Sequence, residues 1–502
     1  MSVLGADRPL DGFPRPHTAD HIHYNPTTTE LRALSASRES STEFGAPAHV
    51  SDHKSRNADR TKNAIDHRFD PEDWSTIKHA IEFLHDRKKE LVCVDRQLGR
   101  HPTATFHCRL FVPKRHARIA VAWMNLLDPV SSDEPDFITV QLPDYDEPRI
   151  RILPESGITC VLGSDYTGEA KKSFLRLFMY RVKQRGGLGL HAGSKRLRVH
   201  RDDDLTDVGQ LFLGLSATGK TTLTCHDFGV SPPESAAMLQ DDVCALLPNG
   251  TVAGSEGRGL YIKTIGLSAA EQASLHRAAC QPEAVLENVD VGTDGTVDFS
   301  SDKHTANTRA VVRREHVDHA AETIDLDRVD QVFFITRNPL TPPIAKLNAE
   351  QATVAYMLGE SIETSAGNPD KVGEAVRVVG TNPFIIGDRG EEGNRFYDLI
   401  RALEVDCFML NTGQIGANGR EIRVADTVAM VTAVARQTIE WRDDRRLRLT
   451  IPRAVPGTTF ETFDPASQIE NFDRKLDRLR RDRWVYLRQF DNLRDPIKAA
   501  VY

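Results

Sequence analysis

The sequence lacks several features that would place the chain outside a cytoplasmic compartment. No apolar run approaches the ~20 residues that cross a bilayer, and residues 1–10 lack the basic-then-apolar layout of a signal peptide. Paired cysteines are also missing, because the seven cysteines are scattered, odd in number and never spaced as CxxC. A disulfide framework and a zinc–cysteine site are therefore not expected. We predict reduced thiols, a cytoplasmic location and no membrane association.

The charge balance offers no electrostatic reason for a polyanionic partner. The formal net charge is −8 over 502 residues, which is small for a chain of this size. Neither nucleic acid nor an anionic membrane is therefore expected to bind. Hydrophobic content of 39% and charged content of 27% are ordinary for a globular protein, and the length allows two or three domains.

Composition and periodicity predict three segments. Residues 1–70 are polar and interrupted by Pro, Ser, Thr and Asn, which predicts a flexible or loosely attached extension, with a histidine-rich metal tail as the alternative. Residues 71–200 are expected to form a mixed α/β lobe with strands at Ile119–Trp123 and Phe137–Leu142 and a helix at Lys171–Gln184. Residues 201–502 are expected to form a second lobe that ends in an amphipathic helical tail.

A phosphate-binding loop is the strongest local signal. The stretch from Gly214 to Thr221 fits G-x-x-x-x-G-K-[ST] at every specified position. The run Leu211–Leu213 suits a buried strand before the loop, and residues 221–224 suit a helix whose N-terminus faces the phosphates. Glycines let backbone N–H groups wrap a polyphosphate, Lys220 reaches the outer phosphates, and the Thr221 hydroxyl ligates Mg²⁺. A polar stretch, Thr364–Lys371, could act as a lid.

Further sequence segments can be interpreted together with this loop. Asp241 and Asp242 end a short apolar run about 20 residues after the P-loop lysine, which suits a carboxylate facing a nucleotide-bound metal. Tyr166, Lys172 and His191 lie in two segments that precede the loop. Taken alone, a histidine among apolar residues is usually a satisfied core residue, and paired lysines on a helix are usually solvated.

The ordered set of segments resembles the ATP-dependent phosphoenolpyruvate carboxykinases. GLSATGKTT at 214–222 is similar to that family's P-loop, with Ala217 where the family typically has glycine. YTGEAKK at 166–172 resembles its YGGEMKK segment, and His191 follows Lys172 at the family's spacing of 19 residues. Further resemblances occur in the family's order at GRHP (99–102), DD (241–242), YIKTI (261–265), LENV (286–289), NTR (307–309) and NTG (411–413).

This resemblance implies a fold, a reaction and a set of site residues. The fold is the family's two-lobed α/β fold, with a P-loop mononucleotide-binding C-terminal lobe and a mixed α/β N-terminal lobe. The reaction decarboxylates oxaloacetate and phosphorylates the enolate with ATP, giving phosphoenolpyruvate, ADP and CO₂ in gluconeogenesis. The implied cofactors besides ATP are Mn²⁺ and Mg²⁺. The catalytic residues would be Lys172, Lys220 and Arg309.

The same resemblance implies how the ligands are divided among the residues. Mn²⁺ would be bound by Lys172, His191 and Asp242, and Mg²⁺ by Thr221. Oxaloacetate or phosphoenolpyruvate would contact Arg100, Tyr166, Lys172 and Arg309. The nucleotide would contact Gly214, Leu215, Ser216, Ala217, Thr218, Gly219, Lys220, Thr221, Thr222, Lys263, Arg309, Arg420 and Thr427.

Chemistry explains why these residue types suit the reaction. Arginines and a divalent metal stabilise the charge of an enolate, and arginine binds carboxylate and phosphate through two parallel hydrogen bonds. Two alternatives remain from the sequence: a P-loop kinase of another small molecule or of a protein on the same fold, and a non-catalytic nucleotide-binding relative.

Overall fold

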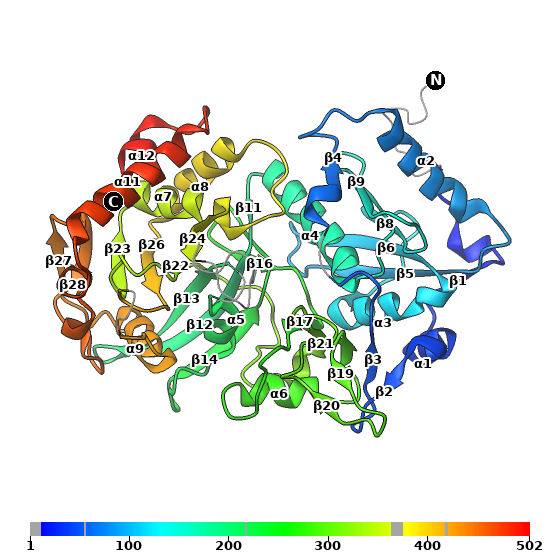
Figure 1. The fold of residues 1–502 in the computed structure, drawn as a ribbon, viewed down its shortest axis with the longest axis horizontal. Coiled ribbons are helices and arrows are strands. Elements are labelled where there is room, and N and C mark those ends of the chain that lie inside the picture. Colours follow the sequence, from blue (N-terminus) through cyan, green and yellow to red (C-terminus); the bar gives the residue numbers. More distant parts are fainter. Residues whose placement is uncertain (1–11, 55–56, 216–217, 363–374, 417–419) are drawn as a thin grey trace. The chain divides into compact units, whose positions relative to one another are not determined.

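The computed structural model describes residues 12–54, 57–215, 218–362, 375–416 and 420–502. It is an α/β structure with mixed sheets, and it divides into two compact units (Figure 1). The first unit comprises Met1–Arg181 and Ser255–Asp318, and the second comprises Val182–Gly254 and His319–Tyr502. Among the described residues, no helix has the length and apolar character needed to cross a bilayer.

The main sheet of the first unit is mixed and has the strand order β1-β5-β6-β8-β10-β9-β4, with β7 paired to β5. Helix α2 (Pro71–His85) packs on this sheet through Ile77, Ala80 and Leu84. The Asp70 carboxylate caps that helix by accepting the N–H groups of Glu72 and Asp73. The strands are β1 (Ile22–Tyr24), β4 (Thr61–Asn63), β5 (Leu91–Leu98), β6 (Phe106–Pro113), β7 (Asp128–Pro129), β8 (Phe137–Leu142), β9 (Arg149–Leu153) and β10 (Ile158–Leu162).

A second sheet of this unit has the order β17-β21-β18-β3-β2 and carries several residues of the site. Its strands are β2 (Ser40–Ser41), β3 (Pro47–His49), β17 (Gly259–Lys263), β18 (Val285–Glu287) and β21 (Arg309–Arg313), and β19 (Asp290–Val291) pairs separately with β20 (Val297–Asp298). Helices α1 (Thr28–Ser35), α3 (Ala117–Leu126) and α6 (Ala273–Ala279) also belong to this unit. Helix α4 (Thr167–Gln184) begins in the first unit, and its last residues, from Val182, belong to the second.

The second unit is built on a mixed sheet in the order β14-β12-β13-β22-β26-β23-β28-β27. Strands β13, β22 and β26 are mutually parallel neighbours, and the others run antiparallel to their neighbours (Figure 1). The strands are β12 (Ala192–Arg201), β13 (Asp204–Leu213), β14 (Ser235–Gln240), β22 (Gln331–Thr336), β23 (Ile344–Leu347), β26 (Asp406–Asn411), β27 (Trp441–Asp444) and β28 (Leu449–Pro452). Smaller sheets join β11 (Leu188–Leu190), β15 (Cys244–Leu246) and β16 (Val252–Gly254), and join β24 (Glu360–Ile362) to β25 (Ala375–Arg377).

Alternation along the parallel strands explains why both faces of this sheet are covered. Leu211 and Leu213 of β13 belong to one apolar cluster, whereas Phe212 between them belongs to another. Successive side chains of a strand point to opposite faces, and parallel strands are usually buried on both. One cluster includes residues of α7 (Ala349–Leu358), α8 (Arg389–Leu403), α11 (Phe472–Arg488) and α12 (Asp495–Ala499), and the other includes residues of α5 (Lys220–Cys225) and α9 (Val424–Ala435).

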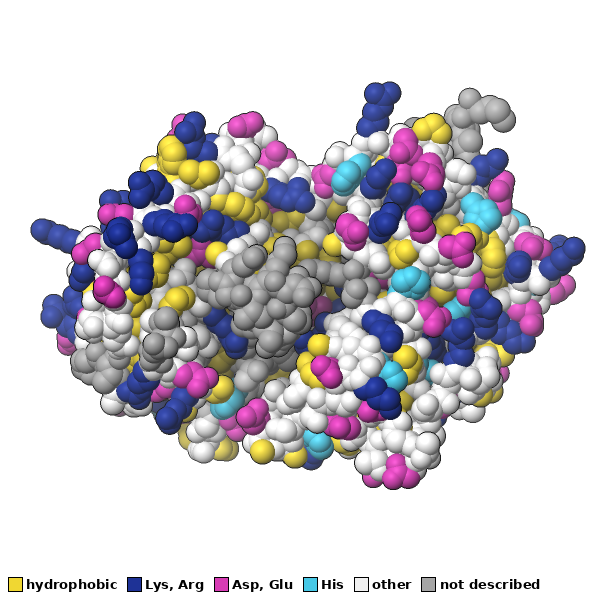
Figure 2. All heavy atoms as spheres, viewed as in Figure 1, with side chains coloured by type: hydrophobic (Ala, Val, Ile, Leu, Met, Phe, Trp, Pro, Cys, Tyr) yellow, Lys and Arg dark blue, Asp and Glu magenta, His cyan; other side chains and the backbone are white. Residues whose placement is uncertain are grey.

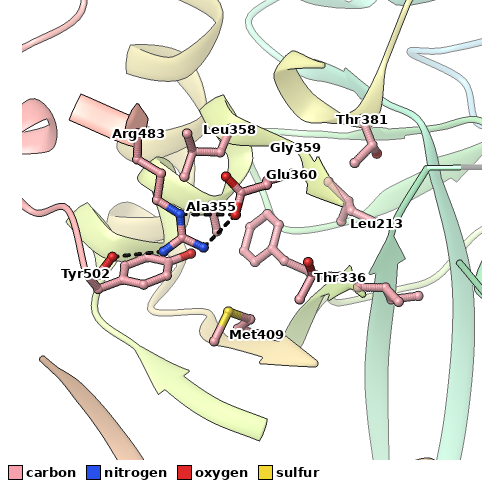
Figure 3. Close-up of a pocket in the computed structure, with 12 residues that line it drawn as sticks. Leu213, Thr336, Ala355, Leu358, Gly359, Glu360, Thr381, Met409, Arg483 and Tyr502 are labelled. Carbon is pink, nitrogen blue, oxygen red and sulfur yellow. Dashed lines mark hydrogen bonds and ion pairs between the residues drawn. The ribbon is translucent and has the colours of Figure 1, made fainter. Parts of the chain in front are cut away.

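The C-terminus is anchored inside the second unit by a buried ion pair. Arg483 of α11 donates from Nη2 to Glu360 Oε1 (2.7 Å) and from Nη1 to the Tyr502 carbonyl oxygen (2.8 Å). Figure 3 shows Arg483 between Glu360 and Tyr502, beside the residues that line a small pocket. Arg377 of β25 donates to the second oxygen of Glu360 at 2.8 Å. This network ties helix α11 to strands β24 and β25.

Three predictions about organisation differ from the structure. Ile119–Trp123 lies in helix α3 rather than in a strand, because a short continuous apolar run has no periodicity that separates a buried helix from a buried strand. Residues 12–70 contribute β1 and β4 to one sheet and β3 to the other, whereas a loosely attached extension was expected. The segment 255–318 clusters with the first unit, so the expected boundary at residue 201 does not match the two units. The predicted lid at 364–371 lies outside the described residues.

Candidate active site

The P-loop sequence connects a strand to a helix, as expected. Strand β13 ends at Leu213, and helix α5 begins at Lys220. Gly219 precedes the helix with φ +102°, a left-handed conformation that favours glycine. At Gly214, an added Cβ would lie 2.4 Å from the Thr218 hydroxyl oxygen, so this position also requires glycine. Ser216 and Ala217, two predicted nucleotide contacts, lie outside the described residues.

The structure brings the side chains of Lys220 and Thr221 to the aspartate pair. Lys220 Nζ lies 3.2 Å from the Asp242 carbonyl oxygen and 3.4 Å from Asp242 Oδ1. The Thr221 hydroxyl donates to Asp241 Oδ2 at 3.0 Å. Asp242 has φ +90°, which is uncommon for a residue with a side chain and costs backbone strain. The strained residue is therefore the one that lies closest to the P-loop lysine.

His191 completes this cluster in the second unit. Its Nδ1 lies 2.6 Å from the Thr381 carbonyl oxygen, and its Nε2 lies 3.0 Å from Asp242 Oδ1. A carbonyl oxygen can only accept, so Nδ1 carries a proton and donates it to Thr381. Burial and the positive charge of Lys220 lower the pKa of His191. When the ring is neutral, this tautomer presents the Nε2 lone pair to Asp242 Oδ1.

This donor set fits a divalent cation. With the imidazole neutral, His191 Nε2 and Asp242 Oδ1 are two acceptors 3.0 Å apart, and a shared cation would satisfy both. Imidazole and carboxylate are common ligands of divalent transition metals. Among the described residues, no group of three His, Cys, Asp or Glu side chains could hold a metal.

Tyr166 is the centre of a polar cluster in the first unit. Asn307 Nδ2 and Arg309 Nε both donate to the Tyr166 hydroxyl oxygen, at 3.3 and 3.4 Å, and Arg309 Nη2 donates to Asn307 Oδ1 at 2.8 Å. Lys172 Nζ lies 4.9 Å from the centre of the Tyr166 ring. Burial raises the pKa of Tyr166, but the charges of Arg309 and Lys172 outweigh it, and the pKa is lowered. The cluster concentrates positive charge, which suits an anionic substrate.

Lys263 and Arg100 also lie in the first unit. Lys263 is paired with Arg309 across the antiparallel strands β17 and β21. Arg100 makes two hydrogen bonds to Asp128, at 2.7 and 2.9 Å, and one to the Gly257 carbonyl oxygen at 2.9 Å. The predicted substrate arginine is therefore already engaged by a carboxylate. Binding a substrate carboxylate would exchange one such bidentate partner for another.

Glu287 and Asn307 have site roles that the sequence did not assign. Buried Glu287 accepts the N–H of Thr167 at 2.9 Å and the hydroxyl of Tyr261 at 2.8 Å, which fixes the start of α4 beside Tyr166. Asn307 orients Arg309 and Tyr166 together. Both residues stand within segments that resemble the family, LENV and NTR, so a signal was present. Their roles depend on pairing between distant strands, which the sequence does not show.

Two of the predicted nucleotide-binding residues, Arg420 and Thr427, lie farther along the chain. Arg420 donates to the Thr459 hydroxyl at 2.6 Å and lies 4.7 Å from the centre of the Phe463 ring. Thr427 is buried in α9, where its hydroxyl donates to the Arg423 carbonyl oxygen at 3.2 Å. These contacts leave the nucleotide-binding roles of Arg420 and Thr427 as predictions.

Comparison with known proteins identifies the class to which this fold and site belong. The family model described as phosphoenolpyruvate carboxykinase, ATP form, matches residues 27–461. The chain is 35% identical over 481 residues to the phosphoenolpyruvate carboxykinase (ATP) of Aeropyrum pernix, covering 94% of this chain and 95% of that protein. It is 28% identical over 425 residues to the phosphoenolpyruvate carboxykinase (ATP) of Bradyrhizobium diazoefficiens, covering 78% and 75% of the two chains. The chain belongs to the ATP-dependent phosphoenolpyruvate carboxykinase family.

Proposed function

We propose that this chain is a phosphoenolpyruvate carboxykinase that decarboxylates oxaloacetate and phosphorylates the resulting enolate with ATP. The products are phosphoenolpyruvate, ADP and CO₂, and the typical role of the reaction is gluconeogenesis. Family membership over most of the chain supports this activity. The structural observation that carries it is the cluster of Lys220, His191 and Asp242 at the end of strand β13 and the start of α5.

The proposal includes a two-lobed fold with a P-loop nucleotide site in the second unit. Lys220 would hold the β- and γ-phosphates, and the Thr221 hydroxyl would ligate the Mg²⁺ that accompanies ATP. The nucleotide would lie along the loop that includes Gly214, Thr218 and Gly219, with Thr222 at the start of α5. The position of this loop at the carboxyl end of a parallel strand supports the assignment.

His191 and Asp242 would hold Mn²⁺, and Lys172 is assigned as a third ligand on the resemblance of its motif. When bound, the metal supplies positive charge that stabilises an enolate and a transferring phosphoryl group. The Thr381 carbonyl holds His191 in the tautomer that presents Nε2. The contacts of Asp242 with His191 and Lys220 hold its carboxylate before any ligand arrives, which lowers the cost of ordering it.

The reaction needs positioning and charge neutralisation rather than a protein nucleophile. Loss of CO₂ from oxaloacetate leaves the electron pair of the broken C–C bond in the enolate. The enolate oxygen then attacks the γ-phosphorus of ATP, and the bond to the β-phosphate oxygen breaks to release ADP. Arg309 and Tyr166 would bind the three-carbon acid, and Lys220 would neutralise charge on the phosphates.

The direct test uses ATP labelled at the γ-phosphate together with oxaloacetate and Mn²⁺. We expect the label in phosphoenolpyruvate, with one CO₂ released for each labelled product. Label transferred to another acceptor without loss of CO₂ would identify a different kinase. Tight ATP binding without turnover would identify a non-catalytic relative.

A further inference from the structure

We infer that Arg337 binds a phosphate of the nucleotide, a role that none of the motifs above assigns to it. The inference rests on the proposed nucleotide site. Strands β13, β22 and β26 are parallel neighbours, so their carboxyl ends lie at one edge of the sheet. The P-loop follows β13 at this edge. Arg337 is the first residue after β22, and β22 is the strand that pairs directly with β13.

Thr412 ties the neighbourhood of Arg337 to the P-loop. Its N–H donates to the carbonyl oxygen of Thr336 at 2.9 Å, and its hydroxyl donates to the carbonyl oxygen of Thr218 at 2.7 Å. Thr336 precedes Arg337, and Thr218 lies within the P-loop. A single threonine therefore connects the backbone beside Arg337 to the backbone that would wrap the phosphates.

The loop after β26 leaves room for this arginine. A Cβ added at Gly413 would lie 3.1 Å from Arg337 Cβ and 3.2 Å from Arg337 Cα. A side chain at position 413 would therefore press on the arginine, and glycine allows the close approach. The same loop carries Glu421, whose charge acts on Arg337. One carboxylate thus lies near enough to influence this side chain.

One hydrogen-bond donor of Arg337 lacks an acceptor in the described part of the structure. Its Nε is buried, and it has no hydrogen-bond partner among the residues that the structure describes. Burial lowers the pKa of Arg337, and the charge of Glu421 opposes that change. A buried guanidinium donor without an acceptor is costly, and most such groups in proteins are paired. A phosphate provides oxygens that match the guanidinium fork.

Arg337 would supply the second unit with a second cation for the nucleotide, in addition to Lys220. The predicted phosphoryl-contacting arginine, Arg309, belongs to the first unit. An arginine on the nucleotide-binding unit would hold ATP before oxaloacetate binds. Its effect should therefore appear in nucleotide affinity and should scale with the number of phosphates.

The test compares nucleotide binding to the full-length protein and to the variants R337Q, R337K and R328Q. Calorimetric titrations with ATP, ADP and adenosine report the affinity for each ligand. R328Q is a matched control, because Arg328 precedes the same strand β22 at its opposite end and is 72% exposed. We expect R337Q to weaken ATP binding by about 10-fold or more, as loss of a charged hydrogen bond would. R337K should fall between R337Q and the parent, and adenosine binding should not change.

Three outcomes would overturn the inference. One is R337Q binding ATP as tightly as the parent and R328Q do. Another is an equal loss of affinity for adenosine and ATP, which would show that Arg337 supports the adenine side or the loop rather than a phosphate. If the unmodified protein binds no ATP, the proposed nucleotide site fails and the role of Arg337 fails with it. Thermal unfolding of R337K, which retains the charge, separates a folding defect from a binding defect.

Discussion

At the scale of single residues, the chemistry of the second unit depends on three side chains with fixed neighbours. Thr381 determines which nitrogen of His191 is exposed to Asp242, and Asp242 in turn lies within 3.4 Å of Lys220. We propose that the histidine and the aspartate supply two ligands of a cation site and that the P-loop lysine, which contacts the same aspartate, binds the phosphates. Each side chain should affect a different measured quantity.

Replacing His191 with Gln should weaken the response to Mn²⁺. We expect the Mn²⁺ concentration for half-maximal phosphoenolpyruvate formation to rise by at least about 10-fold, because an imidazole ligand is lost. The KM for ATP should change little. Titrating Mn²⁺ into steady-state assays measures both quantities. His200→Gln is the control, since His200 is exposed on the neighbouring strand β12. Equal Mn²⁺ responses in the two variants would contradict the assignment.

Replacing Lys220 with Met should act on phosphoryl transfer. We expect kcat to fall by about 100- to 1000-fold, because a preorganised charge on the phosphates is removed. The metal response of the remaining activity should be retained. Lys346→Met, at a half-exposed ion pair with Asp406, is the matched control. A Lys220→Met enzyme with normal turnover would show that this lysine does not serve the reaction.

Much of the site could be predicted from the sequence because its residue types lie in short ordered segments. Lys220, Thr221, Asp242 and His191 come together as the motifs indicate. The contribution of Asn307 required the structure, because its bonds join segments 141 positions apart. The effect of Ala217 stays open, since that residue lies outside the described part of the chain.

At the scale of elements, the β24–β25 hairpin is held to helix α11 by Glu360 and Arg483. Both side chains are buried, and Arg377 of β25 donates a further hydrogen bond to Glu360. Burial opposes ionisation of Glu360, but the two arginines outweigh it and lower the pKa to about 2.

The Glu360 pair should make the second unit sensitive to acid. The folded pKa lies below the ordinary value of 4.5, so the stabilisation is complete above about pH 4.5 and is lost as the pH falls toward 2. Glu360→Gln should lower the free energy of unfolding at neutral pH by about 3–5 kcal/mol, because it leaves buried arginines unpaired. The stability of this variant should also fall less steeply than that of the parent protein as the pH decreases from 4.5 toward 2. Urea unfolding across this range measures both effects.

The control for this prediction is an exposed ion pair in which one partner, Asp473, belongs to the same helix α11. Asp473 binds Arg446 at 2.6 Å, and their side chains are 67% and 47% exposed. Exposed pairs contribute about 0–1 kcal/mol, so Asp473→Asn should cost much less. An equal cost for the two substitutions would show that burial of the Glu360 pair does not determine its contribution.

Element prediction succeeded for two segments of the predicted N-terminal lobe. The apolar run Phe137–Leu142 forms β8, and the predicted helix Lys171–Gln184 lies within α4. Prediction failed at Ile119–Trp123, where every residue of helix α3 is buried. Tertiary packing decided that segment, and neither propensity nor periodicity could.

At the scale of the whole molecule, chain order and spatial units do not coincide. Residues 255–318 return to the first unit after the P-loop, and they bring Lys263, Asn307 and Arg309 to Tyr166. From chain order alone these residues are expected in the second lobe, because no change in composition marks the point where the chain returns to the first unit. Figure 2 shows basic and acidic side chains interspersed over the visible face of the protein.

Comparing ATP with GTP in the conversion of oxaloacetate to phosphoenolpyruvate, with Mn²⁺ present, tests the proposed reaction and its nucleotide together. We expect phosphoenolpyruvate formation with ATP at a rate well above the rate with GTP, and no product without oxaloacetate. Absence of phosphoenolpyruvate with ATP, from a folded protein that binds the nucleotide, would contradict the proposed reaction. A faster rate with GTP would retain the reaction and contradict the assigned nucleotide.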